Sequence, residues 1–418
     1  MTIEDIYQLY STHYKVDTDT RSIRKNTIFF ALKGENFNGN KFAKEALNNG
    51  AIYAIVDEKE YQTEDRIILV DNVLECLQQL ANYHRKKLKT PILSLTGSNG
   101  KTTTKELINV VLSKKFKTTA TKGNLNNHIG VPLTLLSMKP DTEFGIVEMG
   151  ANHLKEIDFL CQITEPNYGY ITNFGKAHLE GFGGIEGVIK GKSELYDYLK
   201  KSNGKIFLND SDETQVKQSE NIHSIPFDSS LEYIDANPFV KLNFNNIELK
   251  TKLIGSYNYN NIAAAITIGT YFGIDKLAIK EAIENYIPTN NRSQIIKKET
   301  TRIILDAYNA NPSSMTLALQ NFDNLDTNDK IIILGDMFEL GETAAQEHQN
   351  IVNIVEDMNV KSVFLIGELF SKTTTKKASK FERFDDFISN FNKSYFENCS
   401  ILIKGSRGMA LERVLSYF

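Results

Sequence analysis

Cysteine is scarce in this chain of 418 residues, which contains only Cys76, Cys161 and Cys399. These three cysteines are widely spaced, odd in number and never arranged as C-x-x-C. Disulfide frameworks and cysteine zinc sites need cysteines paired at characteristic spacings. We therefore expect neither a disulfide framework nor a cysteine zinc site.

Long apolar runs are also missing from the sequence. No stretch approaches the roughly 20 apolar residues that a helix needs to cross a bilayer. The first residues, 1–5, are acidic and lack the apolar core of a secretory signal. We therefore expect a cytoplasmic protein that does not insert into a membrane.

Positive charge is not in excess, because 48 lysine and arginine residues stand against 52 aspartate and glutamate residues, for a net charge of −4. Proteins that bind nucleic acid usually concentrate basic residues on one face. The basic run at residues 84–89 is short and is better explained as a solvated helix end or a linker. The sequence predicts no nucleic-acid partner.

Alternating apolar runs and helical periodicity recur in three blocks, and this alternation predicts an α/β protein. The blocks cover residues 1–89, 90–290 and 291–418, with breaks around Pro91 and Pro288. A chain of this length is expected to form two to four domains. We predict a smaller N-terminal α/β domain, a central P-loop-type domain with a parallel sheet, and a Rossmann-like C-terminal domain.

The expected elements follow from the same patterns, whereas residues 210–250 are polar, irregular and hard to interpret. Expected strands cover residues 27–32, 51–56, 66–70, 92–95, 144–149, 168–173, 205–209, 302–306, 330–334, 362–366 and 400–404. Expected helices include residues 73–88, 105–113 and 261–272.

The central motif is Thr-Gly-Ser-Asn-Gly-Lys-Thr-Thr-Thr at residues 96–104, between an expected strand and an expected helix. Backbone N–H groups of such a loop, together with the helix N-terminus, form a concave site for phosphate oxygens. Lys101 would neutralise the β- and γ-phosphates, and the Thr102 hydroxyl would bind Mg²⁺. The strict P-loop pattern is not met, because Leu95 occupies its first glycine position. The strand–loop–helix context nevertheless indicates a phosphate site.

Polar residues follow two neighbouring strands at the edge where α/β proteins bind ligands. Glu148 ends the strand at 144–149, and His178 follows the strand at 168–173. An amide-rich turn at residues 123–130 contains Asn126 and Asn127. Each feature alone is more typical of structure than of catalysis, but together with the phosphate loop they indicate a nucleotide and Mg²⁺ site.

Residues 190–196, Lys-Gly-Lys-Ser-Glu-Leu-Tyr, look by themselves like an exposed helix segment. A lysine ammonium has donors and no lone pair, so it cannot bind a metal ion. A lysine carbamoylated by CO₂ could do so, because the modified group ends in a carboxylate.

Together these motifs resemble the Mur ligase family, and the resemblance covers nearly the whole chain. The loop at 96–104 is similar to the family's TGxNGKTT motif, and residues 123–130, 148–153, 171–183 and 255–264 follow in the family's order. Three further blocks, at residues 306–312, 334–341 and 404–409, resemble the branch of the family that uses D-alanyl-D-alanine.

The resemblance implies an ATP-dependent amide ligase (EC 6.3.2.10) of peptidoglycan and cell-wall synthesis, a process tied to cell shape and division. The implied reaction joins D-alanyl-D-alanine to UDP-N-acetylmuramoyl-tripeptide through an acyl-phosphate intermediate and forms the pentapeptide precursor. ATP and Mg²⁺ are the implied cofactors, and a monomer suffices. The third domain is expected to move about residues 288–292 and exclude water from the site.

The resemblance also implies roles for individual residues. Thr102, Glu148, His178 and a carbamoylated Lys192 would bind metal, with Lys190 as the alternative if the register of the motif is shifted. Lys101, Lys192 and His178 would be catalytic. The implied ATP site comprises Gly97, Ser98, Asn99, Gly100, Lys101, Thr102, Thr103, Asn258, Asn261, Arg292 and Asp306.

The implied substrate site comprises Asp19, Thr20, Arg21, Asn126, Asn127, Asn309 and Asn311, with Phe338 as a further candidate. Two positions depart from the family pattern. Tyr257 stands where the family commonly has histidine, and Asn38-Gly39-Asn40 stands where it often has Asp-Gly-His.

Two alternatives stay open at this point. One is another amide ligase of the family, either the enzyme that adds the third residue or a folylpolyglutamate-type synthase. The DNPR-type motif of third-residue enzymes is not found, and residues 335–341 speak against both. The other alternative is a regulatory P-loop ATPase, which would need only residues 96–104 and leaves the three C-terminal blocks unexplained.

Overall fold

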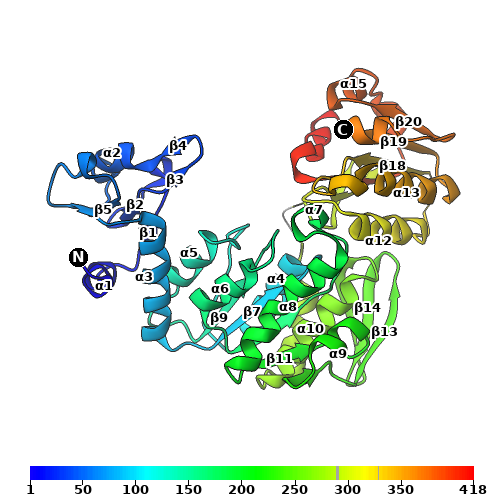
Figure 1. Ribbon diagram of the computed structural model, residues 1–418. Coiled ribbons are helices and arrows are strands. Elements are labelled where there is room, and N and C mark those ends of the chain that lie inside the picture. Colours follow the sequence, from blue (N-terminus) through cyan, green and yellow to red (C-terminus); the bar gives the residue numbers. More distant parts are fainter. Residues whose placement is uncertain (289–290, 328) are drawn as a thin grey trace.

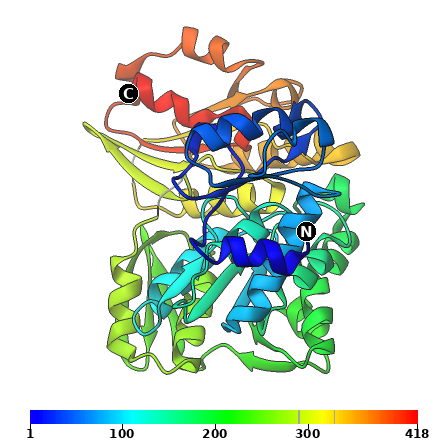
Figure 2. The same cartoon turned by 90° about the vertical axis from the view of Figure 1, so that its left-hand side faces the viewer.

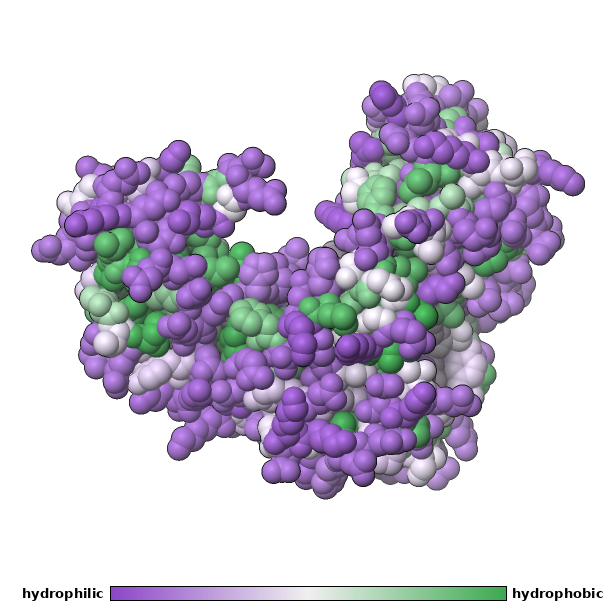
Figure 3. Space-filling view, viewed as in Figure 1, coloured by the Kyte–Doolittle hydropathy of each residue, from purple (hydrophilic) through white to green (hydrophobic). Residues whose placement is uncertain are grey.

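Three sheets with mostly parallel strands follow one another along the chain and organise the N-terminal, central and C-terminal parts (Figure 1). The computed structural model describes residues 1–288, 291–327 and 329–418. The N-terminal and C-terminal parts rise from opposite ends of the central part, and a broad hollow separates them (Figure 3). The expected α/β class with three parts is confirmed.

The N-terminal sheet has four parallel strands in the order β1-β2-β5-β6. Alternate side chains of β2 point to opposite faces, as the pleat of a strand requires. Phe29 packs toward α2, whereas Ile28 and Phe30 pack toward α3. The elements are α1 (Ile3–Tyr10), β1 (Val16–Asp17), β2 (Ile28–Phe30), β3 (Lys33–Gly34), β4 (Phe37–Asn38), α2 (Ala43–Asn48), β5 (Tyr53–Val56), β6 (Ile67–Leu69) and α3 (Val73–Leu88).

Helix α3 joins the N-terminal part to the central part, and α1 lies across the same junction (Figure 2). Arg85 of α3 is 7% exposed and donates to the carbonyls of Thr164 (2.9 Å) and Glu165 (3.0 Å) and to Asn167 Oδ1 (2.9 Å). Tyr10 of α1 donates to the Leu136 carbonyl over 2.7 Å. These buried bonds fix the N-terminal part on the central part.

The central sheet has six strands in the order β12-β11-β10-β7-β9-β8, and every pair is parallel. Helices α4 and α10 cover one face, while α5, α6 and α8 cover the other, so the strands read as continuous apolar runs. The strands are β7 (Ile92–Thr96), β8 (Thr118–Ala120), β9 (Phe144–Glu148), β10 (Tyr168–Ile171), β11 (Lys205–Leu208) and β12 (His223–Pro226). The helices are α4 (Lys101–Leu112), α5 (Gly130–Leu136), α6 (Glu156–Thr164), α7 (Leu179–Phe182), α8 (Ile185–Lys201), α9 (Glu213–Gln218), α10 (Asn258–Tyr271) and α11 (Lys276–Asn285).

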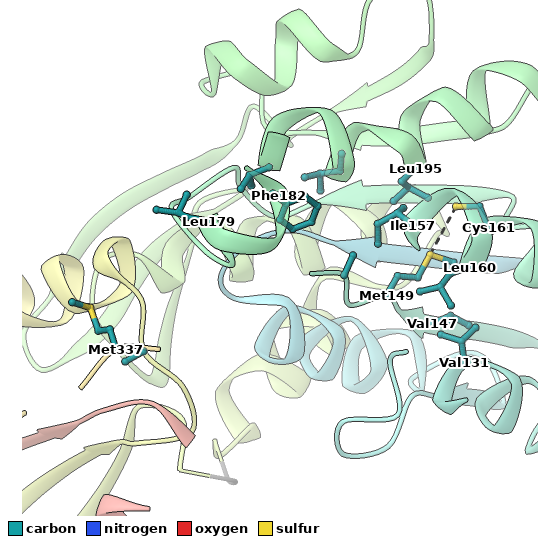
Figure 4. Close-up of a cluster of buried hydrophobic side chains, with 14 of the residues drawn as sticks. Val131, Val147, Met149, Ile157, Leu160, Cys161, Leu179, Phe182, Leu195 and Met337 are labelled. Atoms are coloured by element: carbon teal, nitrogen blue, oxygen red, sulfur yellow. Dashed lines mark hydrogen bonds between the residues drawn. The ribbon is translucent and has the colours of Figure 1, made fainter. Parts of the chain in front are cut away.

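The core on the α5–α6–α8 face lies directly behind the end of β9 (Figure 4). Met149, the residue after β9, meets Cys161 of α6, with the two sulfur atoms 3.9 Å apart. Phe182 of α7 and Leu195 of α8 belong to the same buried cluster. The strand end that carries Glu148 therefore rests on close-packed apolar side chains.

The irregular stretch at residues 210–250 forms α9, β12 and most of an antiparallel sheet of three strands. The strands of this sheet are β13 (Leu231–Ala236), β14 (Phe239–Phe244) and β15 (Ile247–Ile254). Val240, Leu242 and Phe244 alternate on the buried face of β14 and belong to one cluster with α10. The polar residues that hid this pattern in the sequence lie on the outer face.

The C-terminal sheet has the order β16-β17-β21-β18-β19-β20, and only the pair β16–β17 is antiparallel. Helices α12 and α13 cover one face of this sheet. The strands are β16 (Gln294–Lys298), β17 (Thr301–Asp306), β18 (Lys330–Gly335), β19 (Ser362–Ile366), β20 (Ala378–Phe381) and β21 (Ser400–Lys404). The helices are α12 (Pro312–Asp323), α13 (Ala344–Asp357), α14 (Glu368–Ser371) and α15 (Phe384–Ser389). The predicted Rossmann-like alternation is confirmed.

Two local expectations need correction. Helix α4 begins at Lys101 rather than at residue 105, because the phosphate loop leads into the helix without a spacer. The segment at residues 190–196 is helical but not exposed, since Lys192 and its neighbours up to Tyr196 are buried against β10 and α6. Of the two candidate lysines, only Lys190 is exposed.

No helix in the described ranges has both the length and the apolar character to cross a bilayer. The predicted hinge at residues 288–292 includes residues 289 and 290, which lie outside the described residues.

We expect Arg85→Ala to destabilise the protein by about 2 kcal/mol, because it leaves buried acceptors without a donor. Urea unfolding followed by circular dichroism measures the change. Lys87→Ala, at an exposed position on the same helix, is the matched control and should stay within about 0.5 kcal/mol of the wild type. Equal stability of the two variants would contradict the proposed junction.

Candidate active site

A cavity of about 530 Å³ lies at the carboxyl edge of the central sheet, where the central and C-terminal parts meet. It brings together the phosphate loop, the end of β9, the amide-rich turn and the ends of β17 and β21. Most of the predicted site residues line it: Ser98, Asn99, Gly100, Lys101, Thr102, Thr103, Asn126, Asn127, Glu148, His178, Asn258, Asn261, Arg292, Asp306, Asn309 and Asn311.

The phosphate loop is shaped by the residues that follow β10. The Thr172 hydroxyl donates to the Asn99 carbonyl over 2.6 Å, and the Asn99 N–H donates to Asn173 Oδ1 over 3.1 Å. Gly97 has a φ of +139°, and a Cβ there would lie 2.1 Å from Thr172 Oγ1. Only glycine fits at position 97, so this residue supports the loop although it does not line the cavity.

Lys101 is folded back onto the loop that carries it. Its Nζ donates to the carbonyls of Gly97 (2.7 Å) and Ser98 (3.3 Å). Burial, helped by the positive charge of Arg292, lowers the pKa of Lys101 to about 8. The negative charge of Glu148 opposes this shift, and at pH 7 the loop still offers an ammonium group to a phosphate.

Glu148 has a carboxylate oxygen that is free to bind a metal ion. Its Oε1 accepts from the Thr102 hydroxyl (3.2 Å) and from Asn126 Nδ2 (3.0 Å), whereas its buried Oε2 has no partner. Within the described part of the chain, no group of three or more His, Cys, Asp or Glu side chains is arranged so that it could hold a metal ion by itself. However, one carboxylate and one hydroxyl are the ligands that a protein is expected to contribute to a Mg²⁺ site when nucleotide phosphates supply other oxygens. The residues therefore fit Mg²⁺.

His178 lies at the rim of the cavity and reaches the C-terminal part. Its imidazole pairs with the carboxylate of Glu339, from the loop that follows β18. The hydrogen bond from His178 lowers the pKa of Glu339. The structure thus places His178 beside the phosphate loop, where it bridges two parts of the chain.

Lys192 is buried behind the cavity rather than in its wall. Its Nζ donates over 3.0 Å to the carbonyl of Ala151, three residues beyond the end of β9, and lies 4.9 Å from the centre of the Phe182 ring. Burial lowers the pKa of Lys192 well below its ordinary value, and the nearby Lys101 lowers it further. A neutral amine is the form that reacts with CO₂, whereas the exposed Lys190 lacks this environment.

The C-terminal wall of the cavity is made by four side chains at the ends of β17 and β21 and near the linker. Arg292 stacks 3.8 Å from the centre of the Tyr308 ring. Lys404 Nζ donates to Asp306 Oδ2 over 2.5 Å, and both side chains are largely buried. This wall offers an aromatic face, a carboxylate and two cations to a nucleotide.

Asn258 and Asn261 hold α10 against the phosphate loop. Asn261 Nδ2 donates to Asn258 Oδ1 over 2.8 Å, and Asn261 Oδ1 accepts from the Thr104 hydroxyl over 2.9 Å. Asn258 Nδ2 donates to the Ile254 carbonyl over 2.7 Å. Both side-chain amides line the cavity, but the hydrogen bonds that they make within the protein leave few donors and acceptors for an adenine ring.

The predicted substrate residues divide into two groups. Asn126, Asn127, Asn309 and Asn311 line the cavity, although Asn311 also caps α12 and donates to Asn99 Oδ1 over 2.8 Å. Asp19, Thr20 and Arg21 lie in the N-terminal part outside the cavity, where Arg21 pairs with Asp19 at 2.6 Å. Phe338 is 43% exposed and also lies outside the cavity.

Several cavity residues were not predicted as site residues: Asn173, Tyr257, Tyr308 and Lys404. Tyr308 and Lys404 belong to the blocks at residues 306–312 and 404–409, so these motifs could have identified both residues as site residues. Tyr257, where the family commonly has histidine, donates to or accepts from Ser293 Oγ at 3.0 Å. Asn40, in the other departing motif, is buried and bonds Asp57, which makes it structural in this chain.

Family profiles match the chain along most of its length. The Mur ligase family catalytic domain matches residues 13–85, the Mur ligase middle domain matches residues 95–269, and the Mur ligase glutamate ligase domain matches residues 291–407. The chain belongs to the Mur ligase family. The resemblance inferred from the motifs is confirmed.

Several relatives that match nearly the whole chain at about one third identity are named for the same activity. The UDP-N-acetylmuramoyl-tripeptide–D-alanyl-D-alanine ligase of Bacillus subtilis is 33% identical over 96% of this chain and 92% of its own length. A crystal structure of MurF from Acinetobacter baumannii is similar with a TM-score of 0.86 and 28% identity, over 96% of this chain and 92% of that one. MurF from Thermotoga maritima in complex with ADP has a TM-score of 0.83 and 25% identity, over 97% and 96% of the two chains.

Because the pKa of Lys101 is about 8 in the free protein, its amine is charged below that pH and largely neutral near pH 9. Phosphate binding favours the charged form, so Mg-ADP binding should take up close to one proton at about pH 9 and almost none at about pH 7. Calorimetry in two buffers of different ionisation enthalpy measures this uptake. Lys101→Arg keeps its charge throughout and should show no such uptake, whereas equal uptake in both proteins would contradict the assignment.

Proposed function

We propose that the protein is an ATP-dependent ligase that joins D-alanyl-D-alanine to UDP-N-acetylmuramoyl-tripeptide and so forms the pentapeptide precursor of peptidoglycan. The observation that carries the proposal is that the phosphate loop, Glu148 and the Asp306–Lys404 wall meet in one cavity. Full-length relatives named for this activity support the same conclusion.

The reaction needs activation of a carboxylate, because oxide is a poor leaving group for an attacking amine. The peptide carboxylate attacks the γ-phosphorus of ATP, a new C–O–P linkage forms, and ADP leaves. The amine of D-alanyl-D-alanine then attacks the acyl carbon and loses a proton, and phosphate departs with the electrons of the C–O bond. Neither step requires a covalent enzyme nucleophile.

The residues of the cavity are placed to support phosphoryl transfer. The N–H groups of the phosphate loop and the Lys101 ammonium would bind the phosphates and offset negative charge on the transferred group. Arg292, Tyr308 and Asp306 would hold the nucleoside, while Asn258 and Asn261 support the loop from α10.

Thr102 and Glu148 would bind Mg²⁺, which supplies charge neutralisation at the phosphates, and His178 would be a further ligand. The neutral Lys192 amine would add to CO₂ and lose a proton, which gives a carbamate that ends in a carboxylate. This carbamate would supply a second oxygen ligand set near Ala151.

The remaining partners follow from the arrangement of the parts. We assign the UDP-sugar to the N-terminal part, residues 1–89, where Asp19, Thr20 and Arg21 face solvent. The hollow between the outer parts leads toward the cavity, and Asn126, Asn127, Asn309 and Asn311 would meet the two peptides (Figure 3). One chain supplies all these groups, so we propose an active monomer, and the proposed use of ATP and a UDP-sugar supports a cytoplasmic location.

Purified protein with ATP and Mg²⁺ should release phosphate only when UDP-N-acetylmuramoyl-tripeptide and D-alanyl-D-alanine are both present. Mass spectrometry should then detect the pentapeptide product. Release that is indifferent to both substrates would replace the proposal with a regulatory ATPase. A response to free amino acids in place of the dipeptide would move the protein to another branch of the family.

Lys192→Ala should reduce ligase activity by about 100-fold or more, because it removes the carbamate that would supply metal-binding oxygens beside the site of phosphoryl transfer. Lys190→Ala, two residues away but exposed, is the matched control and should stay within about twofold of the wild type. Carbon-13 NMR of protein in labelled bicarbonate should show a carbamate signal that Lys192→Ala lacks and Lys190→Ala keeps. Loss of the signal in Lys190→Ala instead would reverse the assignment.

A further inference from the structure

Residues 173–180 run from just after β10 into the first two residues of α7 and contact both the phosphate loop and the C-terminal part; we call them the coupling segment. Toward the phosphate loop, the Ser98 hydroxyl donates to the Gly175 carbonyl over 2.6 Å. Asn173 exchanges two further bonds with Asn99, as donor through Nδ2 (3.0 Å) and as acceptor through Oδ1 (3.1 Å). The conformation of the phosphate loop therefore depends on the position of this segment.

Toward the C-terminal part, the coupling segment meets the first turns of α12 and α13. The Lys176 N–H donates to Ser313 Oγ over 2.9 Å, and Lys176 Nζ pairs with Glu347 Oε1 at 2.7 Å. The Glu347 side chain is only 11% exposed, so its charge is largely desolvated and relies on its cationic partner. These contacts fix the position of the coupling segment only while the C-terminal part is docked.

Gly175 marks the point where the three elements touch. A Cβ at this position would lie 3.0 Å from Asn99 Nδ2 and 3.1 Å from Ser313 Oγ, closer than ordinary packing distances. Its φ is not positive, so alanine could adopt the same backbone conformation. A methyl group at this position would therefore require the Asn99 or Ser313 side chain to move by a few tenths of an ångström.

We propose that Ser313 and Glu347 are positioning residues that set the shape of the phosphate loop through the coupling segment. Nucleotide binding and docking of the C-terminal part are then linked, and each strengthens the other. Lys176, Ser313 and Glu347 do not line the cavity, so their influence on a bound nucleotide is indirect. The inference rests on the proposed function only in taking an adenine nucleotide as the ligand.

The test is the affinity for Mg-ADP, measured by calorimetry on the full chain. Lys176→Met and Glu347→Gln should each weaken binding about fivefold, and the double variant should bind no more weakly than either, because all three remove one contact. Glu342→Gln alters an exposed glutamate just before the same helix and should stay within about twofold of the wild type. Additive losses in the double variant would overturn the proposal.

A second variant separates the coupling from the loss of a charge. Gly175→Ala inserts a methyl group between Asn99 and Ser313 and should weaken Mg-ADP binding by a similar factor. Small-angle X-ray scattering should show a larger radius of gyration for this variant without nucleotide, and compaction when Mg-ADP is added.

Unchanged affinity in both Gly175→Ala and Glu347→Gln, or weakened affinity with unchanged scattering, would overturn the proposal. Neither measurement uses the amino-sugar or dipeptide substrate. Failure of the coupling would therefore leave the ligase assignment standing, whereas a wild-type protein that binds no ADP would remove the assignment itself.

Discussion

A phosphate site built from backbone N–H groups works only if the loop that carries them keeps its shape without the ligand, and the rest of this structure depends on that constraint. Gly97 and Gly100 have positive φ and no side chain, and apart from the Lys101 ammonium the loop depends on neighbouring elements for support. The bracing comes from neighbours: Thr172 and Asn173 beyond β10 and Asn261 on α10. A parallel sheet makes this possible, since it places the carboxyl ends of β7, β9 and β10 side by side.

Burial of charge is the second consequence of this arrangement. Lys192 is buried and Lys101 is partly buried in the cavity wall, neither is in direct contact with a carboxylate of the described residues, and desolvation lowers the pKa of each. Such desolvation costs stability, so it indicates a functional site more strongly than it indicates a structural one. For Lys101, desolvation leaves the ammonium group with little bound water, so that phosphate oxygens can bind it directly. For Lys192 it favours the neutral amine, which is the reactive form toward CO₂.

The sequence predicted the features that depend on local pattern. The apolar runs at 362–366 and 400–404 match β19 and β21, and the periodic stretch at 73–88 matches α3. The antiparallel strands β13–β15 were missed because their buried residues alternate with polar ones over short lengths. The burial of Lys192 was missed for a different reason, since it depends on packing of α8 against β10 and α6 and leaves no local signature. Contacts between distant blocks, such as Lys176 with Glu347, are likewise invisible to a reading of local pattern.

The two junctions of the central part differ in chemistry, and this difference determines which outer part can move. The N-terminal junction buries an apolar face of α3 and the guanidinium of Arg85. Opening this junction would expose hydrophobic surface and leave buried carbonyl acceptors without a donor. The coupling segment meets the C-terminal part through a hydroxyl, an ion pair with a half-exposed lysine, and the His178–Glu339 pair, and its Leu179 belongs to the same buried apolar cluster as Leu340. Water can replace the polar contacts when the two parts separate, although the largely buried Glu347 makes the replacement costlier than at an exposed ion pair. If the proposed coupling holds, we expect the C-terminal part, rather than the N-terminal part, to exchange between docked and released positions as nucleotide enters and leaves.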